Sequence, residues 1–182
     1  LKRDGLSGRD AAFASRIAYG VMQNRIYLDR CLARCLTQRP EKLEPLLLNI
    51  LRIGAYQILL MDKVPVNAAV NEAVEMAKAH KLSRAAGLVN AVLRNVDRRK
   101  GEPLAFADEL EALSVQTSHP RALVERMVGL LGAEEAEAFL RADNEPVPTT
   151  IQTNTLKTTA KQLCASLEDE GVTVEPHLSL IH

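Results

Sequence analysis

The hydrophobic residues between Pro65 and Val96 recur at the three- and four-residue spacing of two amphipathic helices. One stripe consists of Val66, Val70, Ala73 and Ala77, and the other of Val89, Val92, Leu93 and Val96. Because most of these side chains are small, we expect the helix axes to approach at the lower end of the usual ~8–10 Å range. The pattern predicts a closely packed helix pair.

The same periodicity predicts three further helices before this pair. Ser7 and Asp10 form a start signal for a helix over 11–23, a second helix runs from about 25 to 36 before Pro40, and Pro45 opens a third over 46–61. The residues expected to face inward are Phe13, Ile17, Gly20 and Val21 in the first, and Leu47, Ile50, Leu51, Gly54 and Ile58 in the third. Five helices with short loops predict an all-α bundle over residues 1–101.

The pattern changes after Gly101. Residues 102–116 are acidic and weakly helical; Ser118 and Pro120 then predict the cap and first turn of a helix through Leu131, and 133–142 a further short helix. Beyond the break at 144–148, the segments 149–155 and 172–174 have the character of strands on either side of a helix over 159–170. We therefore expect a helical linker over 102–148 and an incomplete β-α-β subdomain over 149–182, in a chain that is a piece of a longer protein.

The charge is distributed unevenly between these parts, although the net charge is zero. Residues 1–101 carry 18 Lys and Arg against 9 Asp and Glu, whereas residues 102–182 carry 5 against 14. A basic globular half favours a polyanionic partner such as nucleic acid. The alternatives are an ordinary solvated basic surface and docking of the two halves on each other.

Polar residues inside the helix pair leave a similar choice open. Asn67 and Asn71 share one helix face, as do Asn90 and Arg94. Asparagine is a mediocre helix former. These amides either hydrogen-bond a neighbouring helix end or contact RNA.

Motifs for catalysis or cofactor binding are missing from the sequence. No Gly-rich loop follows a predicted strand, and the zinc deaminase signature does not occur. Cys31 and Cys35 lie on one apolar helical face and Cys164 on another, so we expect buried, unactivated thiols rather than a disulfide or a metal site. His119 reads as a helix-start residue, and His177 and His182 lie in the terminal segment, so no catalytic residue, cofactor or metal is predicted. With no long apolar run and no leader, we expect a soluble, cytoplasmic protein.

The bundle region contains several spaced motifs, namely Ala18-Tyr19-Gly20-Val21 with Leu28-Asp29, Ile50 to Gln57, Ala69 to Val74, and Val89 to Arg94. Together these motifs resemble the NusB-type helical domain. Such domains occur alone as transcription antitermination factors and as the N-terminal part of bacterial ribosomal RNA cytosine-5 methyltransferases. The segments Ser118-His119-Pro120, Asn144-Glu145-Pro146 and Thr153 to Lys157 resemble the region that joins this domain to the methyltransferase of the Sun or RsmB type. Gln152 stands where that family commonly has arginine.

The resemblance implies a mainly α fold, in which a NusB-like bundle is followed by a helical linker and the start of a small α/β RNA-binding subdomain. It implies the RNA-binding and scaffolding N-terminal region of an S-adenosylmethionine-dependent 16S rRNA (cytosine-5) methyltransferase, inactive alone. The cofactor and the catalytic cysteine would belong to a C-terminal domain outside this chain, and the partners would be small-subunit rRNA and that domain. The alternatives are a NusB-type antitermination factor, which binds RNA and a ribosomal protein, and a structural interaction module without RNA affinity.

Candidates for contact with RNA come mainly from the basic bundle. They are Arg25, Arg52, Lys78, Lys81, Arg84, Asn90, Arg94, Arg98, Arg99 and Lys100, with Asn154 and Lys157 in the second unit. Arg52 and Arg94 lie inside small-residue motifs, so these two are also candidates for tying helices together through hydrogen bonds.

Overall fold

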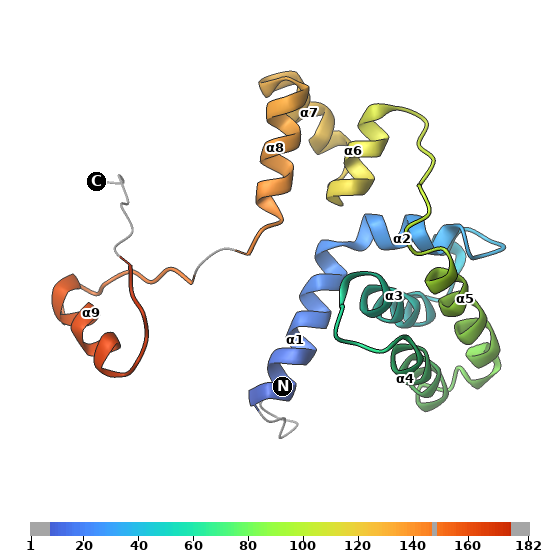
Figure 1. Cartoon of the computed structure of the whole chain (residues 1–182), viewed down its shortest axis with the longest axis horizontal. Coiled ribbons are helices and arrows are strands. Elements are labelled where there is room, and N and C mark those ends of the chain that lie inside the picture. Colours follow the sequence, from blue (N-terminus) through green and yellow to red (C-terminus); the bar gives the residue numbers. More distant parts are fainter. Residues whose placement is uncertain (1–7, 147–148, 176–182) are drawn as a thin grey trace. The chain divides into compact units, whose positions relative to one another are not determined.

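The computed structural model describes residues 8–146 and 149–175, which include all elements discussed below. The chain divides into two compact units, Leu1–Asn144 and Glu145–His182. In the described ranges every regular element is a helix (Figure 1). None of these helices is long and apolar enough to span a bilayer. Ser7, His177 and His182 lie outside the described residues.

Five helices form the bundle of the first unit. They are α1 (Gly8–Gln23), α2 (Arg25–Ala33), α3 (Pro45–Leu60), α4 (Val66–Ala79) and α5 (Ala86–Arg98), with short 3-10 turns η2 (Pro40–Lys42) and η3 (Ser83–Ala85) between them. Helix α3 is the centre of the bundle, because it packs against α1, α2, α4 and α5. Its predicted inward residues are all buried, as are Val70, Ala73 and Ala77 of α4 and the whole predicted stripe of α5. The predicted all-α bundle is confirmed.

Glycine and alanine allow the close packing that the small residues predict. A Cβ atom at Gly54 of α3 would lie 2.5 Å from Leu93 Cδ1 of α5, and one at Gly20 of α1 would lie 2.1 Å from the Tyr56 ring. Separations under about 3 Å do not occur between real Cβ atoms and their neighbours, so alanine at either position would force the Leu93 or Tyr56 side chain, or a helix, to shift. Ala73 of α4 is fully buried as well, in line with the close packing predicted for this helix.

Two details of the predicted bundle are wrong. Phe13 was expected in the core but is 47% exposed, and Gly20 is the buried residue among those described in α1, so α1 packs against α3 through its second half. Helix α2 ends at Ala33 rather than Leu36, and the Cys35 amide then donates to the Leu32 carbonyl in a tighter turn.

Three shorter helices follow the bundle: α6 (Glu109–Thr117), α7 (Arg121–Leu131) and α8 (Ala133–Asp143). Asp108 caps α6, since its carboxylate accepts a hydrogen bond from the Glu111 amide at 2.8 Å. Ser118 was predicted to cap α7 but instead ends α6 in a left-handed conformation, φ 57°. The reason is its backbone amide, which donates to the last carbonyls of α6 and so completes that helix.

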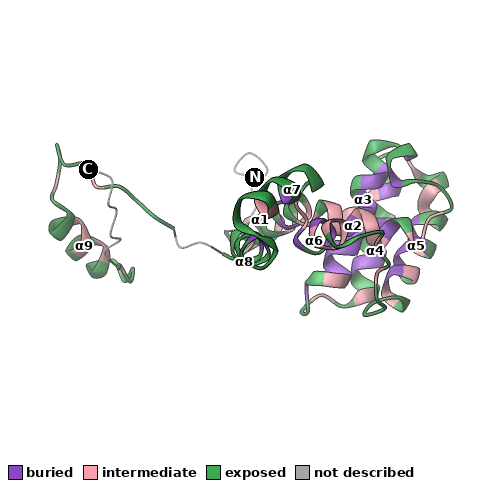
Figure 2. Ribbon diagram, turned by 90° about the horizontal axis from the view of Figure 1, so that it is seen from above, coloured by how far each residue is buried: buried purple, intermediate pink, exposed green. Residues whose placement is uncertain are grey.

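These helices dock on the basic bundle through α2. Arg30 pairs with Glu111 at 2.5 Å, and Arg34 pairs with Glu102 at 2.6 Å. The hydroxyl of Ser118 accepts a hydrogen bond from the Ile26 amide, a donor in the first turn of α2. Part of the acidic half thus neutralises part of the basic half, as the docking alternative predicts. In Figure 2 the buried residues lie on the facing sides of the bundle helices, while α7 and α8 are mostly exposed.

The second unit contains α9 (Ala160–Asp169), close to its predicted bounds. Thr159 and Gln162 form a capping box at its start. The two predicted strands do not form in 149–155 or in 172–174, within the part of the chain that the structure describes. Asn154 turns the first segment, because its carbonyl accepts from the Lys157 and Thr158 amides, and neither segment has a neighbouring strand to pair with.

Candidate nucleic-acid interface

The connection from α4 to α5 presents three cations to solvent. Lys78 lies in the last turn of α4 and pairs with Glu75 at 2.7 Å. Lys81 follows α4 with φ 64°, a position usually taken by glycine, and Arg84 lies in η3. Both are exposed, and neither side chain has a hydrogen-bond or ion-pair partner among the described residues. These two charges are therefore open to an anionic ligand.

Polar side chains bridge the outer seam between α4 and α5. Arg94 Nε donates to Asn90 Oδ1 at 3.2 Å, and its Nη1 donates to Asn67 Oδ1 at 3.5 Å. Asn67 and Asn71 are exposed one turn apart on α4. Asn67 thus accepts a hydrogen bond from a side chain of α5 rather than bonding a helix end. Because Arg94 is exposed as well, the seam combines a helix-to-helix tie with amide and guanidinium groups that face solvent.

Arg52 is held much more firmly. Its Nε and Nη2 each donate to one carboxylate oxygen of Asp29 at 2.7 Å, and its Nη1 donates to Asn49 at 3.0 Å. The side chain is only 16% exposed. This fork geometry ties α3 to α2 and uses all three nitrogens of the guanidinium. It favours a structural role for Arg52 over contact with RNA.

The remaining predicted cations fall into two groups, those whose side chains have hydrogen-bond partners in the protein and those whose side chains have none. Arg98 bonds Asn95, and Lys100 Nζ donates to the Ile58 carbonyl at 2.9 Å. Arg25 and Arg99 are exposed, with no side-chain hydrogen bond or ion pair within the described ranges. Arg25 begins α2 immediately after α1, whereas Arg99 follows the end of α5. Within the described part of the bundle, the predicted cations therefore follow different helices and do not form one patch.

In the second unit, the two predicted residues share a turn. Asn154 Oδ1 accepts from the Leu156 amide at 3.1 Å, as in an Asx turn. Lys157 is exposed at the end of this turn. The geometry makes Asn154 a turn-forming residue and leaves the Lys157 ammonium facing solvent.

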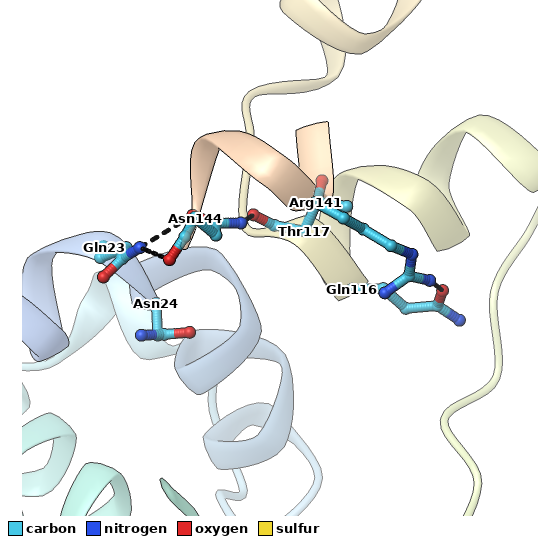
Figure 3. A pocket seen from close by; sticks show the side chains of 6 residues that line it. All are labelled: Gln23, Asn24, Gln116, Thr117, Arg141 and Asn144. Carbon is cyan, nitrogen blue, oxygen red and sulfur yellow. Dashed lines mark hydrogen bonds between the residues drawn. The ribbon is translucent and has the colours of Figure 1, made fainter. Parts of the chain in front are cut away.

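A polar hollow lies where α1, α6 and α8 end, and sequence reasoning missed it. Its volume is about 290 Å³, and its lining residues are Gln23, Asn24, Gln116, Thr117, Arg141 and Asn144 (Figure 3). Gln23 Nε2 donates to the carbonyl of Asn144 at 2.9 Å and to its Oδ1 at 3.1 Å. Asn144 Nδ2 in turn donates to the Thr117 carbonyl at 2.7 Å. The only sequence signal for this junction was the motif that contains Asn144.

Cys31, Cys35 and Cys164 are free thiols, and each is half-buried rather than buried as the sequence predicts. Burial raises the pKa of Cys31 and of Cys35, although Arg99 and Arg34 oppose the rise at Cys35. Burial, with the neighbouring Cys31, raises the pKa of Tyr27 to about 12. His119 Nε2 lies 3.1 Å from Asp143 Oδ2 and links the turn before α7 to the end of α8. Among the described residues no cluster of potential metal ligands occurs.

Comparison with known families matches both parts of the chain. Residues 1–98 match the NusB family, and residues 119–180 match the RsmF/B-like methyltransferase family's ferredoxin-like domain. A probable ribosomal RNA small subunit methyltransferase B of Bacillus subtilis is 34% identical over 96% of this chain and 39% of its own length. A protein of Synechocystis with the same name is 33% identical over 95% of this chain and 39% of its own.

A putative methyltransferase of Mycobacterium tuberculosis is 38% identical over 80% of this chain and 34% of its own length. The chain thus spans about two fifths or less of the length of these curated relatives. The matches run through the bundle and across the acidic helices, in the order that the motifs predict. The chain belongs to the NusB family, with an RsmF/B-like ferredoxin-like domain after the helical bundle.

Proposed function

We propose that residues 1–182 form the RNA-binding and scaffolding N-terminal region of an S-adenosylmethionine-dependent 16S rRNA (cytosine-5) methyltransferase. The observation that carries this proposal is the tandem family match, together with relatives named rRNA small subunit methyltransferase B that align with nearly the whole chain. Small-subunit rRNA is the proposed partner. S-adenosylmethionine and the methyl transfer belong to the region that the longer relatives have in addition, and the proposed location is the cytoplasm.

The proposed roles of the three segments follow the predicted domain boundaries. Residues 1–101 bind RNA, residues 102–148 connect the bundle to the second unit, and residues 149–182 begin a second RNA-binding subdomain. An antitermination factor of the NusB type would need only the bundle. The match over residues 119–180 therefore favours the methyltransferase.

Phosphate contact is proposed first for the cations without protein partners. Lys81 and Arg84 lie close together in the chain between α4 and α5, with Lys78 one turn earlier. Arg25, Arg99 and Lys157 are further exposed candidates. Arg98 and Lys100 have partners that occupy part of their donors, and the outer seam contributes Asn90 and Arg94.

A salt series on the whole chain tests this assignment. Each phosphate contact contributes roughly 0.7 to the slope of log K against log[salt] for single strands and roughly 0.9 for duplexes. The double variant Lys81→Gln with Arg84→Gln should therefore reduce the slope by about 1.4 to 1.8, measured by fluorescence anisotropy with labelled 16S rRNA segments.

The matched control removes two exposed charges elsewhere, by Arg39→Gln with Lys42→Gln. It alters the net charge equally and should leave the slope near that of the unmodified chain. Absence of RNA binding at low salt would refute the proposed function. An equal fall in slope for both double variants would refute the assignment of phosphate contact to Lys81 and Arg84.

A further inference from the structure

We propose that the polar hollow between the ends of α1, α6 and α8 holds the base of one unstacked RNA nucleotide, with Tyr19 as the adjacent stacking surface. This inference rests on the proposed RNA binding. It goes further by assigning base recognition to residues outside the predicted interface.

The walls of the hollow are fixed by hydrogen bonds between the helix ends. Gln23 at the end of α1 binds Asn144 at the end of α8, and Asn144 binds Thr117 at the end of α6 (Figure 3). Asn144 Nδ2 also lies 3.3 Å from the Leu140 carbonyl within α8. A site built this way is held in shape before a ligand arrives, which reduces the entropy lost on binding.

The lining retains donors and acceptors that these bonds do not use. Within the described residues, no partner is found for Gln23 Oε1, Asn24 Oδ1, Gln116 Nε2 or Arg141 Nη1. The bond between Arg141 Nη2 and Gln116 Oε1 is long, at 3.4 Å. Asparagine, glutamine and arginine are the side chains that read base edges, because each base presents donors and acceptors side by side.

Size and polarity also fit a base. A volume of about 290 Å³ holds one nucleobase and leaves the sugar and phosphate outside. Pockets for drug-like molecules are lined mainly by apolar and aromatic groups. This lining consists of amides, a hydroxyl and a guanidinium, so a planar polar ligand suits it better.

Tyr19 supplies the aromatic surface that single-stranded RNA uses for stacking. It lies one turn before Gln23 on the same face of α1 and is 72% exposed, whereas Tyr56 is buried in the core. Arg16 is exposed one turn earlier on that face. An exposed aromatic ring beside a cation and a polar hollow is the combination that binds splayed bases.

The test uses residues 1–182 with labelled 12-nucleotide RNAs of oligo-U, oligo-C and oligo-A. Good base contacts change affinity by about 5- to 150-fold, so the unmodified chain should bind the best RNA at least about 5-fold more tightly than the worst. Gln116→Ala should bring this ratio close to one without changing the salt slope. The matched control, Gln38→Ala at an exposed loop position, should keep the ratio.

Tyr19 is tested by rescue. Tyr19→Ala should weaken binding of all three RNAs by about 5- to 150-fold, and Tyr19→Phe should restore it, because phenylalanine keeps the stacking face. Circular dichroism of each variant verifies the fold. RNA binding without base preference, or a ratio unchanged in Gln116→Ala, would overturn this inference while the proposed function stands. Failure to bind any RNA at low salt would overturn both.

Discussion

Replacement of Gly54 by alanine should destabilise the bundle, although alanine is the better helix former. The new Cβ would lie 2.5 Å from Cδ1 and 2.9 Å from Cδ2 of Leu93, where ordinary contact begins at 3.4 Å. Leu93 is fully buried, so it or a helix must shift by about 1 Å in a close-packed interior. Overpacking of this kind costs about 1–3 kcal/mol. The gain in helix propensity, about 1 kcal/mol, offsets only part of that cost.

Gly87→Ala is the matched control on α5. No atom lies within 4 Å of a Cβ at Gly87, and the residue is exposed. This variant should therefore be stabilised by a few tenths to about 1 kcal/mol. Urea unfolding followed by circular dichroism should place Gly54→Ala about 1–3 kcal/mol below Gly87→Ala.

A double-mutant cycle isolates the clash with Leu93. In a Leu93→Ala background the crowding atoms are gone, so Gly54→Ala should become neutral or stabilising. The argument for close packing between α3 and α5 fails if Gly54→Ala is as stable as Gly87→Ala in the unmodified background.

Two further predictions concern the Arg52–Asp29 pair and the half-buried thiol of Cys31. Arg52→Lys keeps the charge but loses the fork to Asp29, so the free energy of unfolding should fall by about 1 kcal/mol in urea titrations; an unchanged value would mean that the paired bonds add nothing. Since burial raises the pKa of Cys31, iodoacetamide at pH 8 should alkylate it more slowly in the folded chain than in urea, and its rate should continue to rise above pH 9; equal rates in peptide mass spectrometry would contradict this.

Most of the bundle could be predicted because its core stripes are local in sequence. The spacing of Val70, Ala73 and Ala77 places them on one face of a helix whatever the tertiary structure. A helix face made of small residues can be buried only by another helix that packs closely against it. The prediction failed where distant residues decide. Ser118 looks like a helix start beside Pro120, but its backbone amide completes α6 and its hydroxyl accepts a hydrogen bond from an amide 92 positions earlier in the chain.

The candidate sites were harder to predict for the same reason. Charge composition identified the exposed Lys81 and Arg84, whereas the small-residue motif around Arg52 marked that residue as a candidate helix tie without showing that its partner, Asp29, lies on another helix. The polar hollow joins residues that are up to 121 positions apart, so no spacing in the sequence marks it. The strand prediction at 149–155 rested on alternation alone, and the turn at Asn154 prevailed.

The docking of the acidic helices leaves the unpaired charges of Lys81 and Arg84 on a different part of the bundle from the polar hollow. Glu111 of α6 pairs with Arg30 on α2, and Glu102 pairs with Arg34 directly after α2, so this side of the bundle loses cations that would otherwise attract phosphate. Helix α3 lies between α2 and α4, and the unpaired charges of Lys81 and Arg84 follow α4 (Figure 1).

Among the described residues that line the hollow, Arg141 is the cation, and it already pairs with Glu137 at 2.7 Å. The hollow therefore adds little to the counterion release that determines salt dependence, and its amides act through hydrogen bonds. This is why loss of Gln116 should remove base preference and leave the salt slope unchanged, whereas loss of Lys81 and Arg84 should do the opposite.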